Sequence, residues 1–481
     1  MTDNLLTQFA DFASNWYGLL LLVLVGLFAQ QMSRIPADHR KFTAVMALYF
    51  FLVIVAYWIL KPIKKALFIG YYKVHGGLYD LAPAQMELLA KETNILLALV
   101  MSLVLIWLRR RFNATGFGLA VTLLFAFGLA LLIPFAKQPG EAIVWGLYLY
   151  GDMFASSMVA LFFATLHDRS SVEDSRRIYG LVGMGGVVGG LVGSILSGSL
   201  DRLAGVQGAM GVSFTMMLCL AVISGWVARQ VHAHHADNLS KNDDLFDSSK
   251  TIIQARPLLL HENNSLFNGA KAVLHSRPLL LIAAILLLYE MTSVLIDYQF
   301  TSTVSREVGA DKLKQYFSAV YTFSNSMAVL IQLLLTTWVM RKHSLRLALL
   351  VMPLAIMLGE SAYILVPTLL TASLLNTADS AFAYSIHQTA REALYVPLSR
   401  RDKYEAKAFI DIVWLRFSKG IAVLLGLGLS LFITTGGADT GGVPLAAGVV
   451  AFVLAWVWLL NKVPRQDAIA REFAPKPFLP D

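Results

Sequence analysis

Charged side chains are scarce in this sequence. Asp, Glu, Lys and Arg make up 15% of the 481 residues, whereas hydrophobic residues make up 57%. A soluble protein carries roughly 25% charged residues. Apolar runs of about 20 residues, the length that crosses the core of a bilayer, recur along the whole chain. The scarcity of charge therefore excludes an ordinary soluble protein and predicts an all-α polytopic membrane protein.

Cysteine is almost absent. The single Cys219 excludes an internal disulfide, and its apolar segment indicates a small core residue. The first 34 residues also lack the basic start and the small-residue cleavage site of a secretory signal. We therefore expect the apolar segment 17–33 to form an extra N-terminal span, with an interfacial helix as the alternative.

The remaining apolar segments predict twelve spans, which divide at the polar segment 232–276 into two sets of six. The stretch HDRSSVEDSRRIYG after the fourth of them resembles LSRRDKYEAKAFID after the tenth. Two weakly repeated halves are typical of alternating-access carriers, so we expect two six-helix bundles of the major-facilitator type. The predicted spans are 42–70, 86–108, 115–136, 141–166, 177–201, 207–231, 278–300, 315–340, 345–366, 368–390, 406–434 and 443–462. The predicted parts are an extra N-terminal helix at 1–41, a first half at 42–231, a linker at 232–276, a second half at 277–462 and a tail at 463–481.

Basic residues are distributed unevenly between the two sides of the predicted membrane. Alternate connections, together with the tail from Lys462 onward, hold 27 of the 39 Lys and Arg. The connections on the other side and the adjoining helix ends hold 7, and 5 lie within spans. Because basic loops stay in the cytoplasm, we expect the 232–276 linker and the C-terminus on that side of a bacterial inner membrane. This asymmetry accounts for the net charge of +8 and predicts no nucleic-acid partner.

Several ionisable residues lie deep within the predicted spans. At 1.5 Å per residue, Asp152 is roughly 17 Å, Glu290 about 20 Å and Lys419 about 18 Å from an end of its span. Arg416 lies one turn before Lys419 on the same face, and Asp297 belongs to the span of Glu290. Charges at this depth favour a path for a charged solute over simple extension to the interface. A structural salt bridge between the two halves is the alternative.

Three lysines interrupt the apolar run YWILKPIKKALF at residues 57–68. Lys61, Lys64 and Lys65 share one helical face in the outer half of their span. A lysine near a helix end can extend its ammonium to the interface. Like charges at this spacing repel each other, however, so the three together need carboxylates or an anion nearby. The cluster predicts contact with an anionic solute.

Four segments that carry these residues resemble the ATP:ADP antiporter family of plastids and obligate intracellular bacteria. LKPIKKALF at 60–68 is similar to the family's Leu-Arg-Asp-Thr-Lys-Asp segment, and REALYVPLSRRDKYEAKAFIDIVWLRFSKG at 391–420 is the most specific match. YGDMFASSMVALFFATLHDRSSVEDSRRIYGLVGMG at 150–185 and LYEMTSV at 288–294 resemble two further segments. The resemblance implies that Lys64 and Lys419 stand at functional lysines. It also implies that Asp152 and Glu290 stand at functional glutamates.

The first of these segments departs from the family at three positions. Lys61, Pro62 and Lys65 stand where the family has arginine, aspartate and aspartate. The segment is therefore more basic than in the family. A relative that moves another anion would keep the scaffold and change such positions.

We therefore expect a secondary active transporter of a small organic anion, by resemblance a nucleotide such as ATP or ADP that is exchanged across the bilayer. No enzymatic activity, bound cofactor or metal is implied. The alternatives are proton-coupled transport of a different anionic metabolite and a membrane-embedded transferase. The predicted substrate ligands are Lys61, Lys64, Lys65, Arg416 and Lys419, and the predicted gating or coupling carboxylates are Asp152, Glu290 and Asp297.

The charge asymmetry makes a direct prediction about orientation. Reporter proteins fused near residue 250 and after residue 465 should both remain in the cytoplasm, because basic segments resist export. Alkaline phosphatase and a fluorescent protein, which are active on opposite sides of an inner membrane, distinguish the two locations. An exported reporter at either position would contradict the predicted topology.

Overall fold

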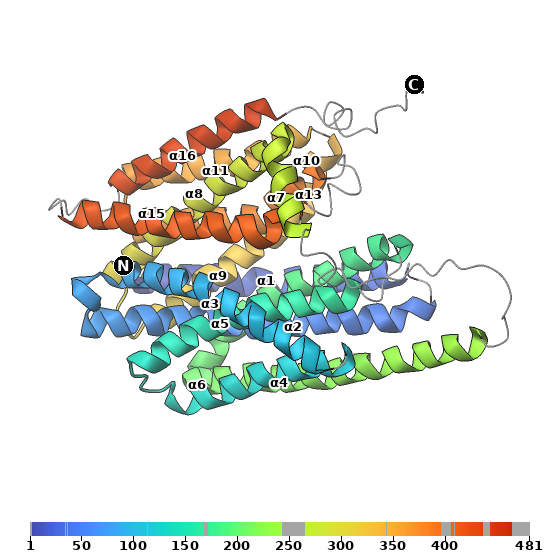
Figure 1. Cartoon of the computed structure of the whole chain (residues 1–481). Coiled ribbons are helices and arrows are strands. Elements are labelled where there is room, and N and C mark those ends of the chain that lie inside the picture. The colour runs from blue at the N-terminus through green and yellow to red at the C-terminus, as the bar shows by residue number, and fades with distance from the viewer. Residues whose placement is uncertain are drawn as a thin grey trace, which may run out of the picture. The chain divides into compact units, whose positions relative to one another are not determined.

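The protein is almost entirely helical (Figure 1). The computed structural model describes residues 2–33, 35, 37–112, 114–167, 172–242, 265–342, 344–395, 406–407, 409–435 and 443–463, and these residues contain no strand. The longer helices are α1 (Thr2–Ser33), α2 (Ala37–His75), α3 (Pro83–Arg111), α4 (Ala114–Leu132), α5 (Glu141–His167), α6 (Val172–Asn242), α7 (Ser265–His275), α8 (Arg277–Glu307), α9 (Leu313–Leu330), α11 (Leu345–Leu365), α12 (Leu369–Phe382), α15 (Leu415–Thr435) and α16 (Val443–Lys462). The shorter helical elements are η1 (Leu78–Asp80), η2 (Ile133–Phe135), η3 (Ile331–Thr336), α10 (Thr337–Lys342), η4 (Ala383–His387), α13 (Gln388–Leu394) and η5 (Ile410–Trp414).

Ten helices in the described part of the chain are long and apolar enough to cross a membrane. One of them, Val182–Val227, has 46 residues, and a single helix of that length would be about 69 Å long. Gly205, with φ 66° and ψ −173°, interrupts the helical geometry of α6 inside this stretch, so α6 accounts for two predicted spans. The predicted all-helical membrane fold is confirmed.

Two of the predicted spans take a different form in the structure. The span predicted at 368–390 consists of α12, the π-helical turn η4 and α13 in succession. The extra N-terminal segment lies in α1, whose apolar part Gly18–Ser33 is shorter than the helices that qualify as spans. Most of the predicted linker and nearly all of the tail lie outside the described residues.

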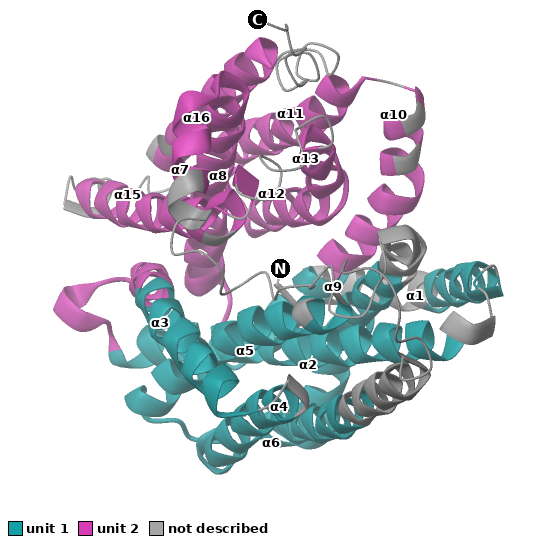
Figure 2. Cartoon of the chain, turned by 45° about the vertical axis from the view of Figure 1, so that its right-hand side comes forward, with its two compact units in different colours: residues 1–75, 93–257, 310–322 teal, residues 76–92, 258–309, 323–481 magenta. Residues whose placement is uncertain are grey.

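The chain divides into two compact units (Figure 2). Unit 1 comprises residues 1–75, 93–257 and 310–322, and unit 2 comprises residues 76–92, 258–309 and 323–481. Each unit contains most of one predicted six-helix half. Helices α3 and α9, the second helices of the two halves, each contribute residues to both units.

Glycines on α6 allow it to pack directly against the backbone of α2 in unit 1. A Cβ atom added to Gly185 would lie 2.6 Å from the carbonyl oxygen of Ala47, and one added to Gly193 would lie 2.7 Å from that of Val55. Gly189, midway between them, would clash in the same way with the α2 backbone. Small residues at every fourth position permit this close approach of membrane helices. The glycine-rich sequence of α6 is thus a packing surface for α2.

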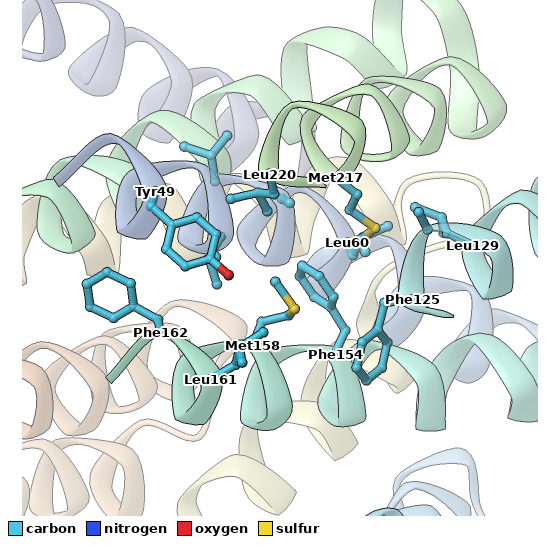
Figure 3. Packing of buried hydrophobic residues seen from close by; sticks show 14 of the residues in the cluster. Tyr49, Leu60, Phe125, Leu129, Phe154, Met158, Leu161, Phe162, Met217 and Leu220 are labelled. Atoms are coloured by element: carbon cyan, nitrogen blue, oxygen red, sulfur yellow. The ribbon is translucent and has the colours of Figure 1, made fainter. Parts of the chain in front are cut away.

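Aromatic and methionine side chains fill the core of unit 1 (Figure 3). Tyr49 of α2 lies against Phe162 of α5 with ring centroids 5.6 Å apart, and Phe125 of α4 lies 5.7 Å from Phe154. The unbranched side chain of Met217, from α6, fills the space beside them. Helices α2, α4, α5 and α6 therefore share one continuous apolar core.

In unit 2, helix α8 packs mainly against α12, α15 and α16. The ring of His387, from η4, lies 4.7 Å from Tyr289 of α8 and 5.6 Å from Trp456 of α16. The indole of Trp414 donates a 2.8 Å hydrogen bond to the carbonyl oxygen of Ala283. These contacts hold η4 and η5 themselves against α8.

The contact between α2 and α6 predicts a position-specific sensitivity to side-chain size. Gly193→Ala places a Cβ against the backbone at Val55 and the Cβ of Trp58, and overpacking of this kind costs about 1–3 kcal/mol. We expect a lower thermal unfolding midpoint for the purified protein in detergent. Gly183→Ala is the matched control, because its Cβ would meet nothing within 4 Å. An equal loss of stability in both variants would contradict the proposed packing.

Candidate functional site

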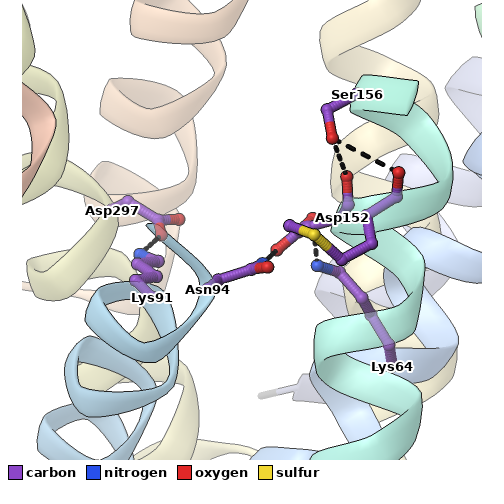
Figure 4. Close-up of polar contacts among 7 residues, drawn as sticks. Lys64, Lys91, Asn94, Asp152, Ser156 and Asp297 are labelled. Atoms are coloured by element: carbon purple, nitrogen blue, oxygen red, sulfur yellow. Dashed lines mark hydrogen bonds and ion pairs between the residues drawn. The ribbon is translucent and has the colours of Figure 1, made fainter. Parts of the chain in front are cut away.

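Lys64 of α2 is buried in unit 1 and forms an ion pair with Asp152 of α5 (Figure 4). Only 5% of Lys64 is exposed, whereas 31% of the Asp152 side chain is. Asn94 of α3 donates a 2.6 Å hydrogen bond from its amide nitrogen to the other carboxylate oxygen of Asp152. The carboxylate is therefore held by both neighbours.

The sequence around Asp152 creates the space for this ion pair. A Cβ atom on Gly151 would lie 2.8 Å from Cδ of Lys64, so the lysine stem lies directly on the α5 backbone. The ammonium nitrogen of Lys64 also lies 4.3 Å from the ring centroid of Tyr148, one turn earlier on α5. A cation over an aromatic ring is stabilised by the ring quadrupole. Helix α5 thus supplies a carboxylate, an aromatic face and a gap for one lysine.

The other two lysines of the motif lie against aromatic rings. The Lys61 nitrogen is 4.2 Å from the centroid of Trp58 and 4.7 Å from that of Tyr321. Lys65 is buried, with its nitrogen 5.5 Å from the centroid of Phe317. Tyr321 and Phe317 come from the part of α9 that belongs to unit 1. The three lysines therefore have different surroundings, and Lys64 forms the ion pair with Asp152.

A second set of charged residues lies in unit 2 around Glu290 of α8. Lys419 of α15 and Arg391 of α13 both act electrostatically on the Glu290 carboxylate. Lys419 is exposed, whereas Glu290 is partly buried. Arg416 is also partly buried, and it forms no ion pair with any residue in the described part of the chain. Glu290 and Lys419, two of the residues singled out in the sequence, thus belong to one electrostatic set.

Sequence reasoning missed two members of this second set, Asp379 and Arg391. The hydroxyl of Ser293 donates a 2.8 Å hydrogen bond to Asp379 of α12, and Asp379 and Arg391 both act electrostatically on Tyr289. Asp379 lies within the predicted span 368–390, so the depth argument applied to Asp152 would have found it. Arg391 is the first residue of segment 391–420, which carries the most specific resemblance to the family. The residue selected from that segment was Lys419, near its other end.

Asp297, the third candidate carboxylate, forms an ion pair with Lys91 in unit 2. Lys91 lies on α3, one turn before Asn94 (Figure 4). The side chain of Lys91 is only 15% exposed. Asp297 is therefore already paired with a cation from its own unit.

The π-helical turns η4 and η5 flank the residues around Glu290. Segment η4 separates Asp379 from Arg391, and η5 precedes Arg416 and Lys419. Such turns widen the helix locally and occur frequently at functional sites. The geometry marks this part of unit 2 as a second candidate site, in addition to the Lys64 and Asp152 pair of unit 1.

Two family models match this chain. The model described as Major Facilitator Superfamily matches residues 46–390, and the model described as TLC ATP/ADP transporter matches residues 362–466. The predicted resemblance to the ATP:ADP antiporter family is confirmed by the second match. These matches indicate a membrane transporter rather than an enzyme.

Curated relatives carry related names at low identity. The ADP,ATP carrier protein 1 of Chlamydia pneumoniae is 21% identical over 343 residues, which cover 65% of each chain. The ADP,ATP carrier protein 5 of Rickettsia bellii is 26% identical over 169 residues, which cover 31% of this chain and 34% of that protein. The matched region thus spans just under two thirds of the first relative and about one third of the second.

Solved structures share the fold over nearly the whole chain. A POT family transporter in complex with a thioalcohol-conjugated peptide matches with a TM-score of 0.59 and 14% identity, covering 90% of this chain and 100% of that one. The nucleoside transporter NupG matches with a TM-score of 0.51 and 13% identity, at 90% and 100% coverage. Similarity at this level of identity establishes the fold alone.

The ion pair between Lys64 and Asp152 predicts how a substitution should act. Asp152→Asn removes the negative charge but keeps an oxygen that can accept a hydrogen bond from Asn94. We expect transport to fall sharply while the amount of folded protein stays close to wild type. Transport rate and thermal unfolding midpoint are measured on the same preparation. If the rate falls only in proportion to folded protein, the carboxylate has a structural role alone.

Proposed function

This chain belongs to the Major Facilitator Superfamily, and on this premise we propose that it exchanges nucleotides of the ATP/ADP type across a bacterial inner membrane by alternating access. The C-terminus lies in the cytoplasm in this proposal. The buried ion pair between Lys64 and Asp152 is the observation that carries it. The names of the relatives, ADP,ATP carrier proteins, support the choice of substrate.

The ion pair is suited to an exchange reaction because it keeps the empty site neutral. A buried ammonium without a counter-charge is strongly destabilising, so Lys64 needs Asp152 when no substrate is bound. A nucleotide phosphate carries the same sign of charge as the carboxylate and can replace it at Lys64, where the lysine acts as a point charge. The Asp152 carboxylate then keeps its hydrogen bond from Asn94.

Unit 2 repeats this arrangement of a carboxylate facing cations. Glu290 lies within electrostatic reach of Lys419 and Arg391, and the exposed position of Lys419 makes its ammonium accessible. We assign Lys64 and Lys419 as phosphate ligands, and Asp152 and Glu290 as the carboxylates that hold them in the empty state. Lys61, Lys65 and Arg416 contribute positive potential, and Asp297, paired with Lys91, acts as a gating carboxylate.

A second candidate function is proton-coupled transport of a different anionic metabolite. The basic first motif favours it, because Lys61, Pro62 and Lys65 stand where the related family has arginine, aspartate and aspartate, so the segment gains one cation and loses two carboxylates. A thermal-shift screen of purified protein with nucleotides and other organic anions separates the two functions, since a ligand that binds the folded state stabilises it.

Substitution of Lys64 tests the proposed phosphate contact directly. Loss of a hydrogen bond to a charged group costs about 1.5–3 kcal/mol, which corresponds to a roughly tenfold to hundredfold loss of affinity. We expect Lys64→Gln to weaken ADP binding by this factor in isothermal titration calorimetry. The control Lys73→Gln lies near the C-terminal end of the same helix and should leave the affinity unchanged.

A double variant distinguishes loss of the phosphate contact from misfolding of the protein. Lys64→Gln alone leaves Asp152 without its cation, whereas Lys64→Gln with Asp152→Asn removes both charges and keeps hydrogen-bonding side chains. The double variant should fold and still bind ADP weakly. Wild-type affinity in either variant would remove Lys64 from the site, and equal losses in Lys64→Gln and Lys73→Gln would indicate a diffuse positive field.

A further inference from the structure

Glu360 is a fully buried carboxyl group that none of the preceding roles uses. It lies on α11 in unit 2, and its exposed fraction is 0%. The amide nitrogen of Gln299, from α8, donates a 2.9 Å hydrogen bond to Oε1 of Glu360. Both residues belong to helices that qualify as membrane spans. Ionisable residues in such positions are rare and are usually functional.

The atoms left without partners in this pair indicate its protonation state. Oε2 of Glu360 and Oε1 of Gln299 are both buried acceptors without a hydrogen-bond donor in the described part of the chain. They belong to the same two side chains that the first hydrogen bond already joins. A protonated carboxyl has one O–H donor. A proton on Oε2 would let Glu360 donate to the free oxygen of Gln299, so that one proton satisfies both atoms in a cyclic acid–amide pair.

The charged residues of the described chain do not stabilise a negative charge on Glu360. Burial and the Gln299 hydrogen bond are the influences that act on its carboxyl, and no charged residue of the described chain does so. Tyr363, one turn along α11, shares a 3.1 Å hydrogen bond with Thr303 of α8 instead. The elements that pack against α11 carry other charged or titratable side chains. Each of these either contacts another partner or does not act on the Glu360 carboxyl. They include Asp379, His387, Arg391, Glu392 and Lys462.

The carboxyl is nevertheless close to an end of its helix. Glu360 lies five residues before Leu365, the last residue of α11, which is about 7.5 Å at 1.5 Å per residue. Gly359 beside it lies close to Leu375 of α12, which a Cβ atom would approach to 2.9 Å. A shift of α11 against α12 and α8 is the movement that would bring the carboxyl toward water.

We propose that Glu360 is a proton-binding site of this carrier, with Gln299 as the residue that positions it. In the conformation described, the proton resides on Oε2 and is donated to the Gln299 amide oxygen. When α11 shifts, the O–H bond breaks, the proton passes to water and the carboxylate is hydrated. Because the group is neutral when buried and charged only when wet, its protonation is coupled to the conformational cycle. This inference rests on the proposal that the chain is a carrier, and it supplies the coupling ion.

Infrared spectroscopy of the purified protein in lipid at neutral pH tests the protonated state without any substrate. The wild type should show the C=O stretching band of a buried protonated carboxyl, and Glu360→Gln should lack it. Glu360→Gln keeps an amide pair with Gln299, so it should fold normally. Glu307→Gln, an exposed position at the end of α8, is the matched control and should retain the band. Gln299→Leu should lose or shift the band because it removes the positioning partner.

Transport in proteoliposomes tests the coupling. ATP uptake by the wild type should change at least severalfold when an ionophore collapses an imposed proton gradient, and uptake by Glu360→Gln should not respond. A wild type without the carboxyl band, or a band that survives in Glu360→Gln, overturns the protonated state. Wild-type uptake that is indifferent to the gradient overturns the coupling. If the wild type shows the band but neither binds nor moves ATP, the nucleotide proposal fails while the proton site stands.

Discussion

A lysine ammonium buried inside a membrane protein requires a counter-charge, and this requirement organises unit 1. Lys64 is almost completely buried, and Asp152 supplies the negative charge from the facing helix α5. Gly151 lets the lysine stem lie on the α5 backbone, and Asn94 fixes the other carboxylate oxygen. Because a buried charge without its partner is strongly destabilising, any ligand that displaces the carboxylate from Lys64 must itself be an anion.

The packing of α2 against α6 determines which way the lysine face of α2 is turned. Glycines at every fourth position of α6 bring the two backbones into direct contact, so that side of α2 is occupied by α6. The lysines therefore face α5 and the first turns of α9, whose tyrosine and phenylalanine rings lie against Lys61 and Lys65. Backbone packing on one side of a helix thus orients the charges on the other.

Four carboxyl groups within the helices of the described chain have two kinds of surroundings. Asp152, Glu290 and Asp297 each lie near cations, which favour the ionised form. Glu360 lies beside an amide and near no charged group of the described chain, a setting that suits the neutral acid. A carrier with both kinds can free cations for an anionic substrate at the first and bind a proton at the second.

The sequence by itself determined the membrane class, the division into helices and the depth of Asp152, Glu290 and Lys419, because hydropathy and helical rise depend only on the order of residues. It also showed that Lys61, Lys64 and Lys65, on one helical face, need a counter-charge. Only the tertiary structure decided that Lys64 pairs with Asp152, since the pair depends on a gap at Gly151 in another helix. It likewise revealed the pairing of Lys91 with Asp297 and of Glu360 with Gln299. Partners separated by 61 to 206 residues meet through helix packing, which no local sequence pattern records.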